Sequence, residues 1–450
     1  MTKPTLSSSV TQKVGNYRWT ICALLFFATT INYLDRQVLS LLQPMLAEEF
    51  GWTDSDYGTI VGVFSIVYAA SMLFAGRFID WLGTKKGYAW SIIVWSIGAI
   101  LHAFATFIPG RIFGFTLGRT VLAIGEAGNF PAAIKATAEY FPKKERAFAT
   151  GIFNSGANVG AILAPIVVPW IAYHMGWQWA FIIIGAVGFV WLIAWLIMYE
   201  IPSKNKNLSA AEYMYIHSDD IANEQPIEQE SEDDGQKFSF IQCLKYRQTW
   251  SFAFGKFMTD GVWWFFLFWT PAYLKAQYGM EGIDIQWPIA LLYTITVIGS
   301  VGGGAFPTYF INKGMEPYAG RMKAMFIIAL FPLVIIGAQY LGQYSYWWAM
   351  LLIGIGGSAH QAWSANIFTT VSDMFPKKAT ATIVGIGGMA GGIGSFLINK
   401  GSGMLFDYSE TTWGSKEPGY TIVFCICAVA YLIAWSVMKS LVPKMTPLKM

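Results

Sequence analysis

The sequence predicts an all-α membrane protein in which twelve transmembrane helices form two pseudo-symmetric halves of six. Three observations support this prediction: the composition, the apolar runs and the placement of basic residues. Hydrophobic residues make up 55% of the 450 residues and charged residues 13%. Soluble proteins carry about 25% charged residues. The composition therefore excludes a soluble enzyme and a disordered chain, and the small net charge of +3 argues against a nucleic-acid partner.

Twelve apolar runs are long enough to cross a bilayer, which takes roughly 20 residues in a helix. They occupy residues 19–41, 57–79, 87–107, 113–138, 147–172, 178–199, 249–273, 287–311, 323–341, 347–373, 380–404 and 419–441. Several contain glycine and proline, which transmembrane helices tolerate. We expect each run to form one transmembrane helix in direct contact with lipid.

Lysine and arginine fall mainly on one side of these runs. If both termini and every second loop share a side, that side, with the adjoining ends of the runs, holds 22 of the 30 basic residues and the opposite side holds four. Basic loops remain in the cytoplasm, so both termini are predicted to be cytoplasmic. The polar start lacks the cleavage site of a signal peptide, so the first helix is expected to stay attached. The predicted location is the plasma (inner) membrane, as a multi-pass protein.

One long polar stretch, rich in acidic residues, divides the runs into six and six. The predicted organisation is a cytoplasmic tail (1–18), an N-terminal six-helix half (19–199), a cytoplasmic linker (200–248), a C-terminal six-helix half (249–441) and a cytoplasmic tail (442–450). The linker is interpreted as a solvated connection, with a regulatory role as the alternative.

A short internal repeat supports this division. The sequence YFPKK at 140–144 recurs as MFPKK at 374–378, after a long run and before a run rich in small residues in both cases. Parallel repeats of this kind form two halves about an axis along the membrane normal, with the binding site between them near the midplane. The same offset of 234 residues places Glu126 opposite His360, and Asn154 and Asn158 opposite glycines.

Polar residues inside the runs mark the candidate site, because charges in a bilayer are costly and usually face a cavity. Most of the charged ones lie in the first half. The candidates in the first half are Asn32, Tyr33, Asp35, Arg36, Arg119, Glu126, Lys135, Asn154 and Asn158. Those in the second half are Lys256, Asp260 and Trp264, which share a helix face, and His360, Gln361, Trp363, Ser364 and Asn366.

This inventory fits an acidic polyol better than a neutral sugar or a lipophilic cation. Arg36 offers a planar fork that suits a carboxylate. Tryptophan and tyrosine present flat faces to a sugar ring, and amide and hydroxyl groups can satisfy its hydroxyls. Asp35 and Glu126, when removed from water, can exchange protons near neutral pH.

Structural alternatives exist for most of these residues. Asp35 and Arg36 can form an ion pair with other helices, and Arg119 can serve as the partner of an acid. His360 can be a neutral packing residue, the asparagines can join helices, and the lysines near helix ends can extend to the membrane surface. Glu126 is the hardest to explain structurally, because an isolated carboxylate in the middle of a span has little structural use.

The loop after the second run carries a family motif. It reads GRFIDWLGTKK at 76–86 and resembles the signature loop of the Major Facilitator Superfamily. The resemblance implies a conformational latch, in which the aspartate can cap a neighbouring helix and the basic residues anchor at the cytoplasmic face. The corresponding residues are Gly76, Asp80, Gly83, Lys85 and Lys86. The equivalent loop of the second half, at 302–314, has no acid.

Within that superfamily the chain resembles the anion:cation symporter family, and most of all its bacterial hexuronate (glucuronate and galacturonate) transporters. The resemblance covers nearly the whole chain except the linker and the tails. It rests on NYLDR (32–36), GEAGNFPAAIKATAEYFPKKERAFATGIFNSGANVGA (125–161), TDGVWWFFLFW (259–269) and AHQAWSANIFTTVSDMFPKK (359–378). It implies proton-driven uptake of a sugar acid by alternating access.

The resemblance also implies roles for particular residues. Arg36 would engage the substrate carboxylate, Asp35 and Glu126 would be protonation sites, and Tyr33 and Tyr68 would line the pocket. Relatives that transport aldonates carry a glutamine and an asparagine at positions that match Ala157 and Gly388 here. This departure weakens an aldonate assignment and leaves the hydroxyl groups to Asn154, Asn158, Gln361 and Asn366.

The leading hypothesis is therefore a proton-coupled hexuronate symporter that functions as a monomer. Alternatives are a transporter of another organic anion, such as an aldonate, an aromatic acid or a phosphate ester, and a transporter-like nutrient sensor. An enzyme is poorly supported, because neither a metal-ligand cluster nor a catalytic triad nor a phosphate-binding glycine loop stands out. No cofactor is expected.

Overall fold

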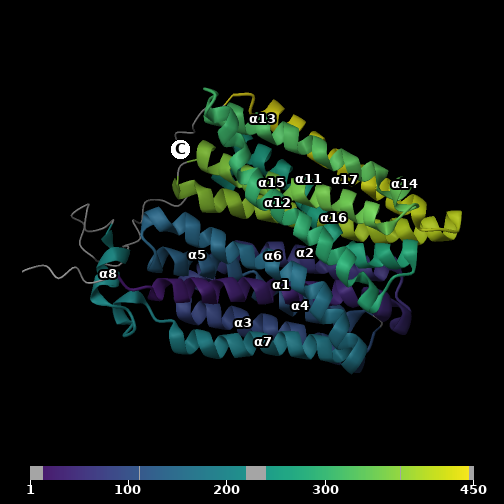
Figure 1. The fold of residues 1–450 in the computed structure, drawn as a ribbon, viewed down its shortest axis with the longest axis horizontal. Coiled ribbons are helices and arrows are strands. Elements are labelled where there is room, and N and C mark those ends of the chain that lie inside the picture. The colour runs from purple at the N-terminus through teal and green to yellow at the C-terminus, as the bar shows by residue number, and fades with distance from the viewer. Residues whose placement is uncertain (1–13, 111, 219–239, 376, 445–450) are drawn as a thin grey trace, which may run out of the picture.

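The computed structural model describes residues 14–110, 112–218, 240–375 and 377–444 (Figure 1). The regular structure of these residues is entirely helical, with no strand among them, which confirms the predicted all-α class. The middle of the predicted linker and most of both predicted tails lie outside the described residues.

The helices pack as two bundles, which lie as a lower and an upper layer in Figure 1. The N-terminal bundle contains α1 (Tyr17–Phe50), α2 (Asp54–Leu82), α3 (Thr84–Leu101), η1 (His102–Phe107), α4 (Phe113–Glu126), α5 (Asn129–Tyr140), α6 (Lys143–Met175) and α7 (Trp177–Met198). The C-terminal bundle contains α11 (Arg247–Tyr278), η3 (Gly282–Ile285), α12 (Gln286–Ile311), α13 (Pro317–Leu330), η4 (Phe331–Gly337), α14 (Ala338–Gly342), α15 (Tyr346–Met374), α16 (Lys377–Trp413) and α17 (Glu417–Leu441).

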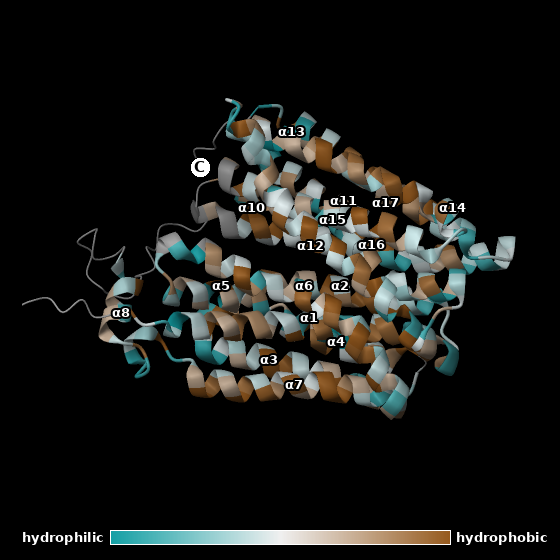
Figure 2. Ribbon diagram, viewed as in Figure 1, coloured by the Kyte–Doolittle hydropathy of each residue, from teal (hydrophilic) through white to brown (hydrophobic). Residues whose placement is uncertain are grey.

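Eight helical segments of the described chain are long and apolar enough to cross a membrane. Figure 2 shows their hydrophobic residues along the bundles, with hydrophilic residues gathered toward both ends. Four further long segments, formed by α1, by α4 with α5, by α11 and by α15, are not among the eight. These four carry most of the charged and polar candidates of the sequence analysis, and such residues lower the mean hydropathy of a helix. The segments that least resemble membrane spans by composition are therefore those that hold most of the candidate site.

Local sequence signals explain where α1 ends and α2 begins. Gly51 adopts a left-handed conformation with φ of 62°, which a residue without Cβ reaches at no steric cost. Thr53 then caps α2 in a capping box, in which its hydroxyl accepts the N–H of Asp56 and the Asp56 carboxylate accepts the N–H of Thr53. The chain therefore reverses within a few residues.

The run at 113–138, predicted as one helix, is instead broken between α4 and α5, and this break places Glu126 at a helix end. Ala127 and Gly128 form a turn after it, and α5 starts at Asn129. Glycine also allows α4 to pack closely on α3, because a Cβ at Gly125 would lie only 2.3 Å from the backbone nitrogen of Trp95. Glu126 is thus held in the interior of the N-terminal bundle, 1% exposed.

The segment between the bundles begins with η2 (Pro202–Lys204) and α8 (Ala210–Ile216) and ends with α10 (Phe240–Cys243). Helix α8 is fixed to the start of α1. The buried carboxylate of Glu212 accepts hydrogen bonds from the backbone N–H groups of Tyr17 and Arg18 and forms an ion pair with the Arg18 side chain at 3.2 Å. We call the end of the molecule that holds α8 and the start of α1 the terminal end, and the opposite end the distal end (Figure 1).

Polar contacts between the two bundles gather at the distal end, where α2 begins. The carboxylate of Asp407 on α16 accepts the backbone N–H groups of Asp54 and Ser55 at 2.9 and 2.8 Å. Lys416 pairs with Asp54 at 2.8 Å, and Lys400 donates to the Ser55 hydroxyl at 2.9 Å. We call these five residues the distal seal. An acid from one bundle thus satisfies the helix N-terminus of the other, where the helix dipole favours negative charge.

Replacing Asp407 with alanine is expected to open the distal seal. The change leaves two N–H groups of α2 without their acceptor, which costs about 1–2 kcal/mol for a lost cap. Spin labels at Glu49 and Thr412, both exposed at this end, would report a larger population of long distances by double electron–electron resonance. Asp284→Ala, at an exposed acid on η3, is the matched control and should leave the distances unchanged. An unchanged distribution in Asp407→Ala would show that the seal does not hold the bundles together.

Candidate functional site

The central feature of the candidate site is a buried ion pair between α1 and α4. Arg36 donates through Nε and Nη2 to the same carboxylate oxygen of Glu126, at 2.9 and 2.7 Å. The side chains are 5% and 0% exposed. The second carboxylate oxygen of Glu126 has no hydrogen-bond partner among the described residues. The pair therefore leaves part of its hydrogen-bonding capacity unused, whereas a purely structural pair is expected to satisfy it.

Four aromatic rings surround the Arg36 guanidinium. Its central carbon lies 5.0 Å from the ring centre of Tyr33, 5.6 Å from Phe64, 4.8 Å from Tyr68 and 5.3 Å from Trp264. We call these four rings the aromatic cage. Trp264 belongs to α11, so the cage joins the two bundles. It holds a cation by its ring faces and offers flat apolar surfaces beside that cation.

Asp35 and Arg119 form a second buried layer next to this pair. Arg119 is fully buried and donates one bond, at 2.9 Å, to the backbone oxygen of Arg36. Neither carboxylate oxygen of Asp35 has a hydrogen bond of normal geometry to a described residue. The indole N–H of Trp95, which also lacks such a bond, is close enough to interact with this carboxylate. The two acids and two arginines together carry no net formal charge when all four are ionised. One added anion would leave this buried cluster with an excess negative charge.

The sequence matches the model of a single protein family over most of its length. That family is the Major Facilitator Superfamily, and the match covers residues 25–398. The chain belongs to the Major Facilitator Superfamily. It is therefore a multi-pass membrane transport protein and not an enzyme, as the sequence predicted.

Known relatives narrow this assignment. The chain is 32% identical to a hexuronate transporter of Escherichia coli (strain K12) over 435 residues, which are 95% of this chain and 96% of the relative. It is 32% identical to a galacturonate transporter of Dickeya chrysanthemi over 298 residues, 66% of this chain and 84% of the relative. The superfamily fold also appears in a crystal structure of a bacterial homologue of the human lysosomal transporter Spinster, in an inward-facing, unoccupied conformation. That structure has a TM-score of 0.72 and 19% identity, and the match covers 97% of this chain and all of the other.

Among the C-terminal candidates, Trp264 belongs to the cage, whereas His360 and Trp363 pack inside their own bundle. His360 stacks on Trp263, with ring centres 5.3 Å apart, and its Nδ1 lies 2.9 Å from the hydroxyl of Tyr431. Trp363 is fully buried against the same tyrosine. Gln361 and Ser364 are half-buried. The structure thus places His360 and Trp363 against α17. Among the described residues, neither forms a hydrogen bond or a ring contact with Arg36.

The three candidate asparagines have different surroundings. Asn366 is buried and donates to the backbone oxygens of Gly303 and Ala362, both at 2.8 Å, so it joins α15 to α12. Asn154 on α6 is exposed, and Asn158 is half-buried one turn further along. The two asparagines of α6 thus lie on one helix face and are at least partly exposed, whereas the amide nitrogen of Asn366 is already engaged.

The predicted latch loop is joined to its own bundle. Asp80 pairs with Lys135 of α5 at 2.7 Å, and Lys85 pairs with Glu200 at 2.9 Å. In this state Asp80 thus forms an ion pair within the N-terminal bundle. The hydrogen bond from Lys85 holds the pKa of Glu200 below its usual value. Because the folded pKa is lowered, this contribution to stability is present at neutral pH and is lost as the pH falls through that pKa.

Of the other latch residues, Gly83 separates α2 from α3 and has a φ of 78°. Lys86 is exposed, and a Cβ added at Gly76 would meet no atom within 4 Å. Sequence reasoning missed the role of Phe64 in the cage. An apolar residue in an apolar helix carries no signal that separates a ligand-facing ring from a packing one.

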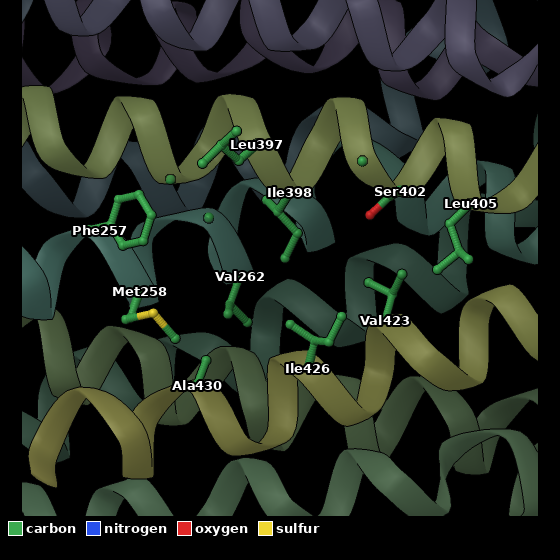
Figure 3. A pocket seen from close by; sticks show the side chains of 13 residues that line it. Phe257, Met258, Val262, Leu397, Ile398, Ser402, Leu405, Val423, Ile426 and Ala430 are labelled. Carbon is green, nitrogen blue, oxygen red and sulfur yellow. The ribbon is translucent and has the colours of Figure 1, made fainter.

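A separate cavity of about 360 Å³ lies between α11, α16 and α17 (Figure 3). Its lining is apolar, with Phe257, Met258 and Leu397 among the larger side chains, and Ser402 supplies the one side-chain hydroxyl. It contains none of the candidate residues. A carboxylate would find no cation there among the described residues, so the ion pair at Arg36 remains the better candidate for anion binding.

Proposed function

We propose that this protein is a proton-coupled symporter that imports a sugar acid, a hexuronate above all, by alternating access. The observation that carries this proposal is the buried Arg36–Glu126 pair inside the aromatic cage. Arginine binds a carboxylate through two parallel hydrogen bonds, and the cage offers ring faces for the sugar. Similarity to hexuronate and galacturonate transporters supports the choice of substrate.

Coupling follows from competition for Arg36. Glu126 and a substrate carboxylate need the same two guanidinium N–H groups. A proton on Glu126 removes its negative charge, so its hydrogen bonds with Arg36 weaken and the guanidinium becomes available to the substrate. Because the cluster with Asp35 and Arg119 is neutral when ionised, binding one carboxylate together with at least one proton avoids an unpaired buried charge. Asp35, whose oxygens lack normal hydrogen bonds, is the second proposed protonation site.

The membrane topology belongs to the same proposal. We assign twelve spans to α1, α2, α3 with η1, α4 with α5, α6, α7, α11, α12 with η3, α13 with η4 and α14, α15, α16, and α17, as two halves of six in the inner membrane of a bacterium. Both termini lie in the cytoplasm, as the basic loops indicate. The distal end then faces outward, and the distal seal closes the outer side of the site in this state. The proposed site residues all belong to one chain, so a monomer suffices.

Uptake of labelled galacturonate into proteoliposomes tests the proposal. With an inward proton gradient, the substrate should accumulate above its external concentration, and a protonophore should abolish this accumulation. Equilibration that ignores the gradient would leave a facilitator and reduce Asp35 and Glu126 to structural roles. If galacturonate and glucuronate both fail to enter while a control transporter is active, the hexuronate assignment is wrong, and aldonates and other organic anions are next.

A further inference from the structure

A further ion pair, largely buried, lies on α11, in the opposite bundle from Arg36. Lys256 and Asp260 are one turn apart and pair at 2.8 Å, with side chains 8% and 17% exposed. The ammonium group lies 4.5 Å from the centre of the Phe368 ring. Asp260 packs against Gly391 of α16, where a Cβ would lie 2.2 Å from its carboxylate oxygen. The coupling mechanism above makes no use of this pair.

The pair lies beside the aromatic cage. Trp264, a cage ring, follows Asp260 by one helical turn on the same face of α11, a step of about 6 Å along the axis. Asp260 also interacts electrostatically with Tyr33, another cage residue, across the boundary between the bundles. A six-carbon acid bound by Arg36 beside Trp264 spans about one helical turn, which is the step that separates Trp264 from Asp260 along α11.

We propose that Asp260 restricts the site to acids with a single carboxylate, by neutralising Lys256. This inference rests on the proposed transport of sugar acids. A hydroxyl group at the far end of the substrate can accept a hydrogen bond from Lys256 and donate one to Asp260. A second carboxylate at that end would meet the negative charge of Asp260, and a like charge in a buried site is strongly unfavourable. Rejection of a close analogue by a repulsive group is a common source of specificity.

The test compares galacturonate, which has one carboxylate, with galactarate, which has two, in uptake by proteoliposomes. Asp260→Asn keeps the shape of the side chain and removes its charge, so Lys256 becomes available to a second carboxylate. The ratio of galactarate to galacturonate uptake should rise by about tenfold or more. The double variant Lys256→Met/Asp260→Asn should lose this gain, because the cation is gone. Asp284→Asn, at an exposed acid of the distal end, should leave the ratio at the wild-type value.

Two results would overturn the inference while the proposed function stands, and a third would overturn both. If wild type accumulates galacturonate but Asp260→Asn leaves the ratio within twofold of it, the pair is structural and the transport proposal stands. If the wild type already takes up galactarate as well as galacturonate, Asp260 excludes nothing. If wild type transports neither acid, the proposed function fails and this inference fails with it. Thermal unfolding of each purified variant, with and without each acid, separates loss of folding from altered selectivity.

Discussion

Replacing Arg36 with lysine is expected to reduce galacturonate uptake by about a hundredfold or more. Lysine keeps the positive charge, but a single ammonium group cannot offer two parallel N–H groups to one carboxylate. It also has no planar group that could stack against the rings of Tyr68 and Trp264. Loss of a hydrogen bond to a charged group costs roughly 1.5–3 kcal/mol, and each 1.4 kcal/mol corresponds to about a factor of ten.

Initial rates of labelled galacturonate uptake, over a range of concentrations, provide the measurement. The matched control is Arg247→Lys, at an exposed arginine in the first turn of α11, which should transport at the wild-type rate. The amount of folded protein in each preparation is checked by size-exclusion chromatography. Near-normal uptake by the Arg36→Lys variant would mean that a point charge is sufficient, and the two-bond recognition of the carboxylate would have to be abandoned.

Replacing Glu126 with glutamine is expected to separate substrate exchange from proton-driven accumulation. Glutamine has almost the same shape, but it carries no charge and exchanges no proton. Arg36 then has no anionic competitor and stays available to the substrate, so exchange of internal for external galacturonate should persist. Accumulation driven by a proton gradient should disappear, because a ligand shifts a conformational equilibrium only through its different affinities for the two states.

Counterflow and gradient-driven uptake, measured on the same vesicles, distinguish these two activities. Glu49→Gln, at an exposed acid near the distal end of α1, serves as the control and should retain both. If Glu126→Gln still concentrates galacturonate, proton coupling must reside elsewhere, and Asp35→Asn becomes the decisive variant. If the variant loses counterflow as well, Glu126 is needed for binding or folding, and the proposed competition for Arg36 is wrong.

Much of the architecture could be predicted from the sequence because its causes are local. The length and hydropathy of each run depend on about twenty successive residues, and they indicated the all-helical membrane class. The turn at Gly51 and Thr53 also depends on a few neighbours, but hydropathy alone ended the first run at residue 41, before the end of α1 at Phe50. The pairing of Lys256 with Asp260 follows from helical spacing, since residues four apart share a face. The repeated FPKK motif also begins with equivalent local structure, because Phe141 and Phe375 are both in extended conformation directly after a helix, α5 and α15 respectively.

The partners of Arg36 could not be predicted in the same way. The sequence left open an ion pair that involves both Asp35 and Arg36. Adjacent residues project about 100° apart on a helix. In the structure Arg36 donates hydrogen bonds to Glu126, 90 residues away, while Asp35 lies near Arg119 and Trp95. The position of Phe64 in the cage has no signal in the sequence, and neither does the ion pair between Asp80 and Lys135.

The sequence by itself thus determined the all-helical membrane class and the residue types that a membrane would otherwise exclude. Only the tertiary structure decided which of those residues meet: Arg36 with Glu126 across the N-terminal bundle, and Trp264 with Arg36 across the two bundles. The physical reason is that hydropathy and helical period act within a few turns of chain. Contacts between helices depend on the rotation and offset of each helix, which the packing of all the others sets together.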